Sequence, residues 1–272
     1  MNETACPAWE TITLSLPISS GQENTMLPSK DASETSIFGH MAMKQTLFEE
    51  HPFFRYVETN PPMEWLLGYI PRMAFWIATF QDVLRVVEQR VGDPQLKSIA
   101  SHIRAGDLGH DHWFLRDMRR LNLEVPTMAD LFGPRHESTR MAAHALMSET
   151  YRASDDRLLV VLLLALESAS YVFFTGMTNY LEVNNFPIDL LYFGRNHLDA
   201  EMAHGIVEAK MDMVVEEAIE ASPLLRAEAI ALIDRVFDAF TSMFAGFVPA
   251  ETVDALSTRA LDEQASAAPQ VP

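Results

Sequence analysis

The sequence predicts a single all-α domain, and three observations support this. No segment alternates Val, Ile or Thr with polar residues in the manner of a half-buried strand. Only 11 of the 272 residues are Gly, which leaves little room for the many turns of a β-protein. Apolar residues recur at helical spacing over long segments. We therefore expect about seven helices, near residues 37–50, 62–91, 94–122, 135–152, 155–182, 187–220 and 223–247.

Helix boundaries are marked by proline and by capping residues. Asp93-Pro94 and Ser222-Pro223 each place an N-cap side chain before a proline in the first turn, where its missing N–H does no harm. Pro71 falls inside the second expected helix, and we predict a kink there because its ring removes one hydrogen bond and crowds the preceding turn.

Composition divides the chain into three parts. Residues 1–35 are rich in Ser, Thr, Asn, Glu and Pro and predict a mobile leader, and residues 249–272 predict a flexible tail. Residues 36–248 form one helical domain in this interpretation. The N-terminus lacks a basic segment followed by an apolar run, so we expect no secretory signal. The single cysteine, Cys6, suits a reducing compartment, and we expect a cytoplasmic protein.

Charge and hydropathy limit the partners. The formal net charge is −18, which disfavours nucleic acid and anionic membranes because both are themselves negative. Residues 158–181 are apolar enough to raise the question of a membrane span, since only Glu167 is charged. The strongly apolar part, 158–166, is too short, and acidic residues flank it. We predict a central helix buried on all sides, and no membrane partner.

The first candidate site residues are His197, Glu201 and His204, spaced i, i+4 and i+7. At about 100° per residue they share one face of a helix. Apolar residues border that face on both sides, so it is more than a solvated stripe, although Glu208 and Asp212 continue it downstream. Imidazole and carboxylate groups between apolar faces are costly unless they are paired or bind a metal ion. We predict metal ligation by these three side chains.

Glu167 is the second candidate, because it is one carboxylate within a long apolar run. Burying it alone would cost several kcal/mol or force its protonation. A structural ion pair is one explanation, and metal ligation is the other. Tyr171 and Phe174 follow at i+4 and i+7, so we expect them to wall the same cavity and to contact a substrate.

The third candidate lies in residues 101–121. His110 shares a face with apolar residues, whereas His112 points the other way and is expected to be exposed. Asp107 precedes His110 by one helical turn in a D-x-x-H pattern, and Asp117 follows it by two turns as a rival ligand. His110 and one of these two carboxylates complete the predicted ligand set: Asp107, His110, Glu167, His197, Glu201 and His204.

Six ligands on three helices exceed what one zinc ion requires. Carboxylates and imidazoles on facing helices are how helical bundles hold two iron or manganese ions. We therefore predict a dinuclear centre of iron or manganese with open positions for dioxygen.

With these motifs, the sequence resembles the heme-oxygenase-like diiron oxidase and oxygenase superfamily. H-x-x-x-E-x-x-H at residues 197–204, Glu167 on the preceding long helix, and GHDHWFLRDM at 109–118 carry the resemblance. It implies a heme-oxygenase-like bundle of about seven helices. It also implies that His197, Glu201 and His204 are ligands on one metal-bearing helix, Glu167 on another and His110 on a third. Asp107 stands where that family usually has Glu.

The resulting prediction is an enzyme, a non-heme diiron oxidase or oxygenase with two ferrous ions as cofactor and dioxygen as co-substrate. Its substrate is expected to be a small organic acid, amino acid or fatty-acid-like molecule. An external electron donor and a homodimer are both compatible with the sequence. Two alternatives stay open: a ferritin-like diiron protein, and a metal-free helical protein that binds heme, through His40 or His51, or another small ligand. Arg195 points away from the metal face of its helix, so we expect it to form a salt bridge to a neighbouring element rather than to bind substrate.

Overall fold

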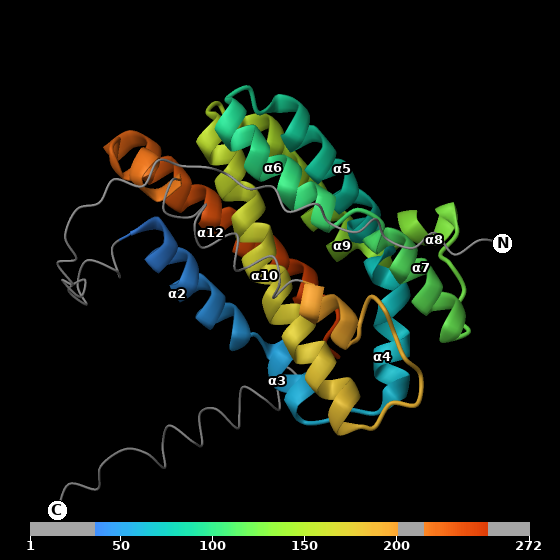
Figure 1. Ribbon diagram of the computed structural model, residues 1–272. Coiled ribbons are helices and arrows are strands. Elements are labelled where there is room, and N and C mark those ends of the chain that lie inside the picture. The colour runs from blue at the N-terminus through green and yellow to red at the C-terminus, as the bar shows by residue number, and fades with distance from the viewer. Residues whose placement is uncertain (1–35, 201–214, 250–272) are drawn as a thin grey trace, which may run out of the picture.

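The computed structural model describes residues 36–200 and 215–249, which are mostly helical and contain no strand. An all-α fold is therefore confirmed (Figure 1). The α-helices of the described residues are α2 Ile37–Glu49, α3 Pro52–Glu58, α4 Met63–Tyr69, α5 Ala74–Arg90, α6 Pro94–Gly106, α7 His110–Arg120, α8 Met128–Phe132, α9 Glu137–Arg152, α10 Asp156–Val183 and α12 Pro223–Ala245. Residues 195–200 and 215–220 are also helical. The predicted leader, residues 1–35, and all but the first residue of the predicted tail lie outside the described residues.

The helices outnumber the seven expected because several expected helices are interrupted. The kink predicted at Pro71 is present as a 3-10 turn, Ile70–Met73, between α4 and α5. The expected helix 94–122 is divided into α6 and α7, so that prediction of one continuous helix is wrong. The short helices α3 and α8 were not expected. The finer prediction of a heme-oxygenase-like bundle stays a prediction.

Helix α10 forms the centre of the bundle. It packs against α2, α3, α5, α6, α9 and α12 and lies between them in Figure 1. Among the described residues it is the one helix long and apolar enough to cross a membrane, and 78% of its most apolar stretch is buried inside the protein. This burial confirms the predicted central helix, since an aliphatic helix needs apolar neighbours on every side.

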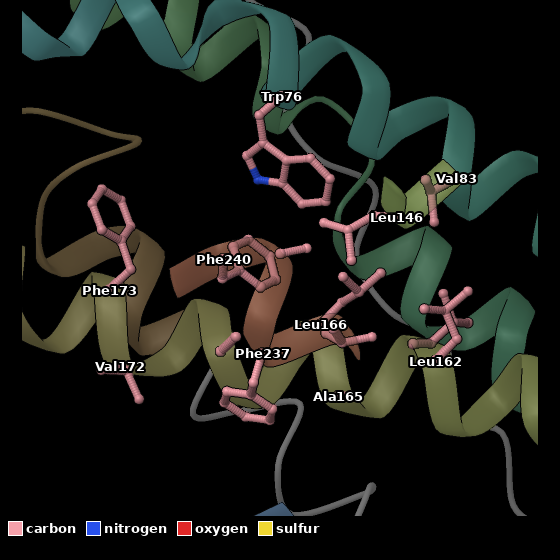
Figure 2. Close-up of a cluster of buried hydrophobic side chains, with 14 of the residues drawn as sticks. Trp76, Val83, Leu146, Leu162, Ala165, Leu166, Val172, Phe173, Phe237 and Phe240 are labelled. Carbon is pink, nitrogen blue, oxygen red and sulfur yellow. The ribbon is translucent and has the colours of Figure 1, made fainter. Parts of the chain in front are cut away.

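The core beside α10 is built by α5, α9 and α12. Figure 2 shows Trp76 from α5 and Leu146 from α9 facing Leu166 and Phe173 of α10, with Phe240 of α12 between them. These side chains are at most 5% exposed. Close packing of this kind fixes the relative positions of the four helices, because a core at crystal-like density tolerates few alternative arrangements.

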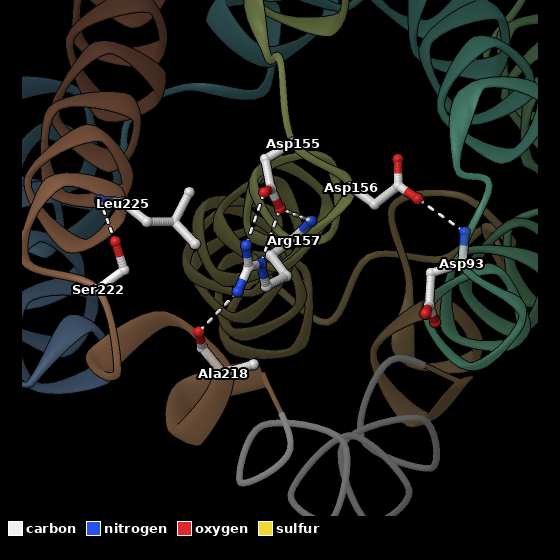
Figure 3. Close-up of polar contacts among 7 residues, drawn as sticks. All are labelled: Asp93, Asp155, Asp156, Arg157, Ala218, Ser222 and Leu225. Carbon is white, nitrogen blue, oxygen red and sulfur yellow. Dashed lines mark hydrogen bonds and ion pairs between the residues drawn. The ribbon is translucent and has the colours of Figure 1, made fainter.

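Capping side chains fix the start of α10 and of its neighbours (Figure 3). The Asp155 carboxylate accepts the backbone N–H of Arg157 at 2.9 Å and pairs with its guanidinium at 2.7 Å. Arg157 also donates to the carbonyl oxygen of Ala218 at 2.9 Å. The two predicted N-caps are confirmed, because Asp93 accepts from Leu96 and Ser222 accepts from Leu225.

Replacing Asp155 with Ala is expected to lower the free energy of unfolding by about 1–2 kcal/mol at pH 7, because α10 loses its N-cap. The hydrogen bond from the Arg157 side chain is the main cause that lowers the pKa of Asp155, with burial opposing it. A lowered pKa stabilises the fold above the ordinary Asp pKa, and that contribution is lost as pH falls through the folded-state pKa. Urea unfolding at pH 7 and at about pH 3 should therefore show a smaller difference between wild type and variant in acid.

Asp155→Asn is the matched control for this prediction. It keeps an oxygen that can cap the helix and removes the charge, so it should cost less than Asp155→Ala at pH 7. An Asp155→Ala deficit of equal size at both pH values would contradict the contribution of the charge.

Candidate metal centre

Three of the six predicted ligands converge in the interior. Asp107, His110 and His197 each offer one ligand atom, and these atoms all lie within 4.8 Å of one another. The three side chains are 3%, 3% and 1% exposed. Two come from the junction of α6 with α7, and the third comes from the helical residues 195–200, far away in sequence.

The junction between α6 and α7 places the first two ligands. Helix α6 ends at Gly106, and Gly109 adopts a left-handed backbone with φ of 95°. This conformation suits glycine because it has no Cβ to collide with its own backbone. Asp107 and His110 therefore stand on either side of a break rather than on one continuous helix, and both side chains are buried. Two glycines within four residues were the available signal for the break.

The donor atoms of Asp107 and His110 fit a shared ion. Asp107 Oδ1 and His110 Nδ1 lie 2.9 Å apart. Two ligand atoms about 2.1 Å from one ion and at a right angle are separated by about 3.0 Å. His110 Nδ1 thus already pairs with Asp107 Oδ1, whereas among the described residues Asp107 Oδ2 is buried and makes no hydrogen bond. Leaving such an atom unsatisfied costs about 1–3 kcal/mol, and a bound cation would offset that cost.

His197 is oriented by a main-chain group. Its Nδ1 lies 2.8 Å from the carbonyl oxygen of Tyr192. A carbonyl oxygen can only accept, so Nδ1 carries the proton and Nε2 presents the lone pair. A histidine ligand whose second nitrogen donates to a carbonyl is a common arrangement in metal sites, since it fixes both tautomer and ring orientation.

Aromatic rings enclose the three ligands. The Phe174 ring lies 3.8 Å from the His197 ring, and the Trp113 ring lies 4.4 Å from the His110 ring, between centroids. The His110 and His197 rings are themselves 4.2 Å apart. These contacts hold both imidazoles in place and keep bulk water away from the ligand atoms.

A small cavity adjoins the three ligands. Its space for the centres of water-sized molecules is about 30 Å³, enough for one or two such molecules. Figure 2 shows three of the residues that wall it, Trp76, Phe173 and Phe240. Of the described lining residues, Asp107 is the one acidic residue, and most of the others are aromatic or aliphatic: Met73, Trp76, Phe80, Phe173, Phe174 and Phe244.

The other predicted site residues are placed differently. Glu167 is 8% exposed on α10, one helical turn before Ser170, which lines the cavity, but it is outside the group of three. Phe174 lines the cavity. Tyr171 is 40% exposed and lines a separate cavity of about 410 Å³ between α3 and α10, so the structure separates it from Phe174. Glu201 and His204 lie outside the described residues.

Asp117, the rival carboxylate, has other partners. It is fully buried, and its oxygens accept the backbone N–H groups of Leu191, Tyr192 and Phe193. Asp107 is therefore the carboxylate beside His110. The expected helix start at residue 187 is wrong for the same reason, because those N–H groups are bound to Asp117 and helical structure begins only at residue 195.

Two smaller predictions are confirmed. His112 is exposed on the outer face of α7. Arg195 forms a salt bridge of 2.7 Å to Glu182 at the end of α10, so it is engaged away from the metal centre. No sequence signal pointed to Tyr192, because its contribution is a main-chain oxygen.

Comparison of the chain with protein-family models and with curated proteins finds no match. The geometry of the site and the motifs in the sequence are therefore the observations that bear on function.

Proposed function

We propose that this chain is a non-heme iron oxidase or oxygenase that uses dioxygen. The observation that carries the proposal is the buried convergence of two histidines and one carboxylate beside an apolar cavity. A 2-His-1-carboxylate set with open positions is the arrangement typical of non-heme iron oxygenases. Iron bound by Asp107, His110 and His197 would supply the redox chemistry that dioxygen requires.

A second iron position is part of this proposal. Glu167, Glu201 and His204 would provide its ligands, in keeping with the sequence motifs and with the family resemblance. The position of Glu167 supports this assignment, because it is buried on α10 one helical turn before Ser170, which lines the cavity beside the three ligands.

The cavity beside the three ligands has room for one or two molecules of the size of water, which suits dioxygen and is too small for the body of an organic substrate. Its described wall contains no Lys or Arg, and its polar side chains besides the three ligands are Gln81, Ser170 and Tyr192. The proposed substrate class is therefore the one expected from the sequence: a small organic acid, amino acid or fatty-acid-like molecule.

The heme-binding alternative is less well supported. His40 is paired with Asp234 at 2.9 Å, and His51 accepts the backbone N–H of Phe53 at 3.0 Å as the N-cap of α3. Both histidines already have structural partners. Neither lines the cavity beside Asp107.

Anaerobic titration with ferrous iron, followed by metal analysis, tests the proposal. We expect about two irons per wild-type chain and about one in Glu167→Gln, because the ligands Asp107, His110 and His197 would remain intact. Glu182→Gln, an exposed carboxylate on the same helix, is the control and should keep two. Oxygen exposure of the ferrous wild-type protein should produce a transient visible absorbance.

Two results would contradict parts of the proposal. A wild-type chain that binds no iron, together with a Soret band on heme addition, would favour the heme-binding alternative. If wild type and Glu167→Gln each bind one iron, the chain has no second metal position and the site is mononuclear.

A further inference from the structure

Asp117 gathers three successive main-chain donors. Leu191 N–H binds Oδ1 at 2.9 Å, and the N–H groups of Tyr192 and Phe193 bind Oδ2 at 2.7 and 3.2 Å. Consecutive N–H groups that converge in this way form an anion site built from the backbone. Burial raises the pKa of Asp117, and these three hydrogen bonds oppose that shift. The segment 191–193 is thus tied to the C-terminal half of α7.

The same segment continues to a predicted metal ligand. One peptide unit, between Tyr192 and Phe193, takes part in both contacts. Its N–H donates to Asp117, and its carbonyl oxygen accepts from His197 Nδ1 at 2.8 Å. A peptide whose N–H binds a carboxylate is polarised, which makes its carbonyl oxygen a stronger acceptor. The His197 Nδ1–H bond is strengthened as a result, and Nε2 becomes a better electron-pair donor.

Local geometry restricts the link that runs from Asp117 through residues 191–193 to His197. Asp117 and His110 lie on the same helix, α7, so the carboxylate is held at a fixed distance along that helix from the first imidazole. The segment itself is tightly folded, because a Cβ on Gly194 would collide with the carbonyl oxygen of Leu190. Phe114 of α7 also packs against Tyr192 and Phe193, with ring centroids 5.5 and 6.0 Å apart.

We propose that Asp117 is a positioning residue of the metal centre, which sets the tautomer and orientation of His197 through the peptide between Tyr192 and Phe193. Helix α7 would then contribute one ligand directly, His110, and hold a second one, His197, through main-chain atoms. This inference rests on the proposed function for the identity of the metal. The geometry of His197 in the metal-free protein does not depend on the proposed function.

Asp117→Asn tests the inference with two readouts. In the metal-free protein, ¹⁵N NMR of the histidine side chains should show His197 almost wholly in the Nδ1–H tautomer in wild type and as a mixture in the variant. In the loaded protein, ferrous iron should bind 10- to 100-fold more weakly, about the loss typical when a partner of a ligating histidine is removed. Asp117→Glu retains the charge at a different reach and should fall between the two.

Asp189→Asn is the control, since it removes an exposed carboxylate beside the same segment and should change neither readout. Should Asp117→Asn fail to fold, Asp117→Glu provides the same two readouts. Loss of stability with an unchanged His197 tautomer and unchanged iron affinity would overturn the inference and leave Asp117 a purely structural residue. Absence of iron binding in wild type would count against the proposed function alone, because the tautomer measurement needs no metal.

Discussion

His110→Ala is expected to weaken ferrous iron binding at the site formed by Asp107, His110 and His197 by at least about 100-fold, a loss of about 2.8 kcal/mol in binding free energy. The substitution removes one of three protein ligands and leaves the neighbouring carboxylate and imidazole too few to hold the ion. Iron-dependent oxygen consumption should fall with occupancy. Anaerobic iron titration of the purified variant, with circular dichroism to verify helix content, provides the measurement.

His112→Ala is the matched control for this experiment. It lies two residues further along α7, makes the same chemical change and points to solvent. It should bind iron as wild type does. Equal iron binding by the two variants would show that the iron is held elsewhere in the chain.

Phe244→Ala is expected to lower the free energy of unfolding by about 3–5 kcal/mol, the range for a large aromatic residue removed from a core. Phe244 is 2% exposed and lies at the centre of an aromatic cluster that joins four helices. Its ring contacts are those with Phe48, Phe53, Phe54, Phe173, Phe240 and Phe247. Truncation would leave a void that these rings cannot fill without moving.

Urea unfolding followed by circular dichroism measures this loss. Leu224→Ala on the same helix is the control, because that side chain is 81% exposed and its removal should change stability by less than about 0.5 kcal/mol. Iron stoichiometry of folded Phe244→Ala should stay near the wild-type value, since the three ligands come from other elements. A loss below about 1 kcal/mol would mean that the cluster repacks around the gap.

Periodicity and capping were sufficient to predict much of the fold. The aliphatic run in α10 predicted a helix buried on every side because no polar face was left for solvent. Asp93 and Ser222 predicted helix starts because their side chains bind main-chain groups close by in sequence. Such interactions are local, and a local pattern contains the information needed to recognise them.

Interruptions were harder to predict because they depend on distant partners. Residues 191–193 have no sequence signal for a non-helical segment, and their N–H groups are bound to a carboxylate on α7. The break at Gly109 had a weak signal in two nearby glycines. Helical periodicity continues across such a break, so it could not show where the helix ends.

The same limit explains the outcome for the two carboxylates near His110. Wheel positions placed Asp107 and Asp117 on or near the buried face, and both are buried. A buried carboxylate can bind a metal ion or main-chain N–H groups, and the residue type is the same in either case. Only the folded chain distinguishes them, because Asp117 meets backbone donors and Asp107 meets two imidazoles.

The glycine joint between α6 and α7 has a thermodynamic consequence. Asp107 and His110 lie on opposite sides of that joint, so an ion bound by both would restrain the two helices relative to each other. Any species that binds the native chain and ignores the unfolded one adds to stability by mass action, about 2.7 kcal/mol at one hundred times its dissociation constant. Metal binding at this site and stabilisation of the α6–α7 junction are thus thermodynamically linked.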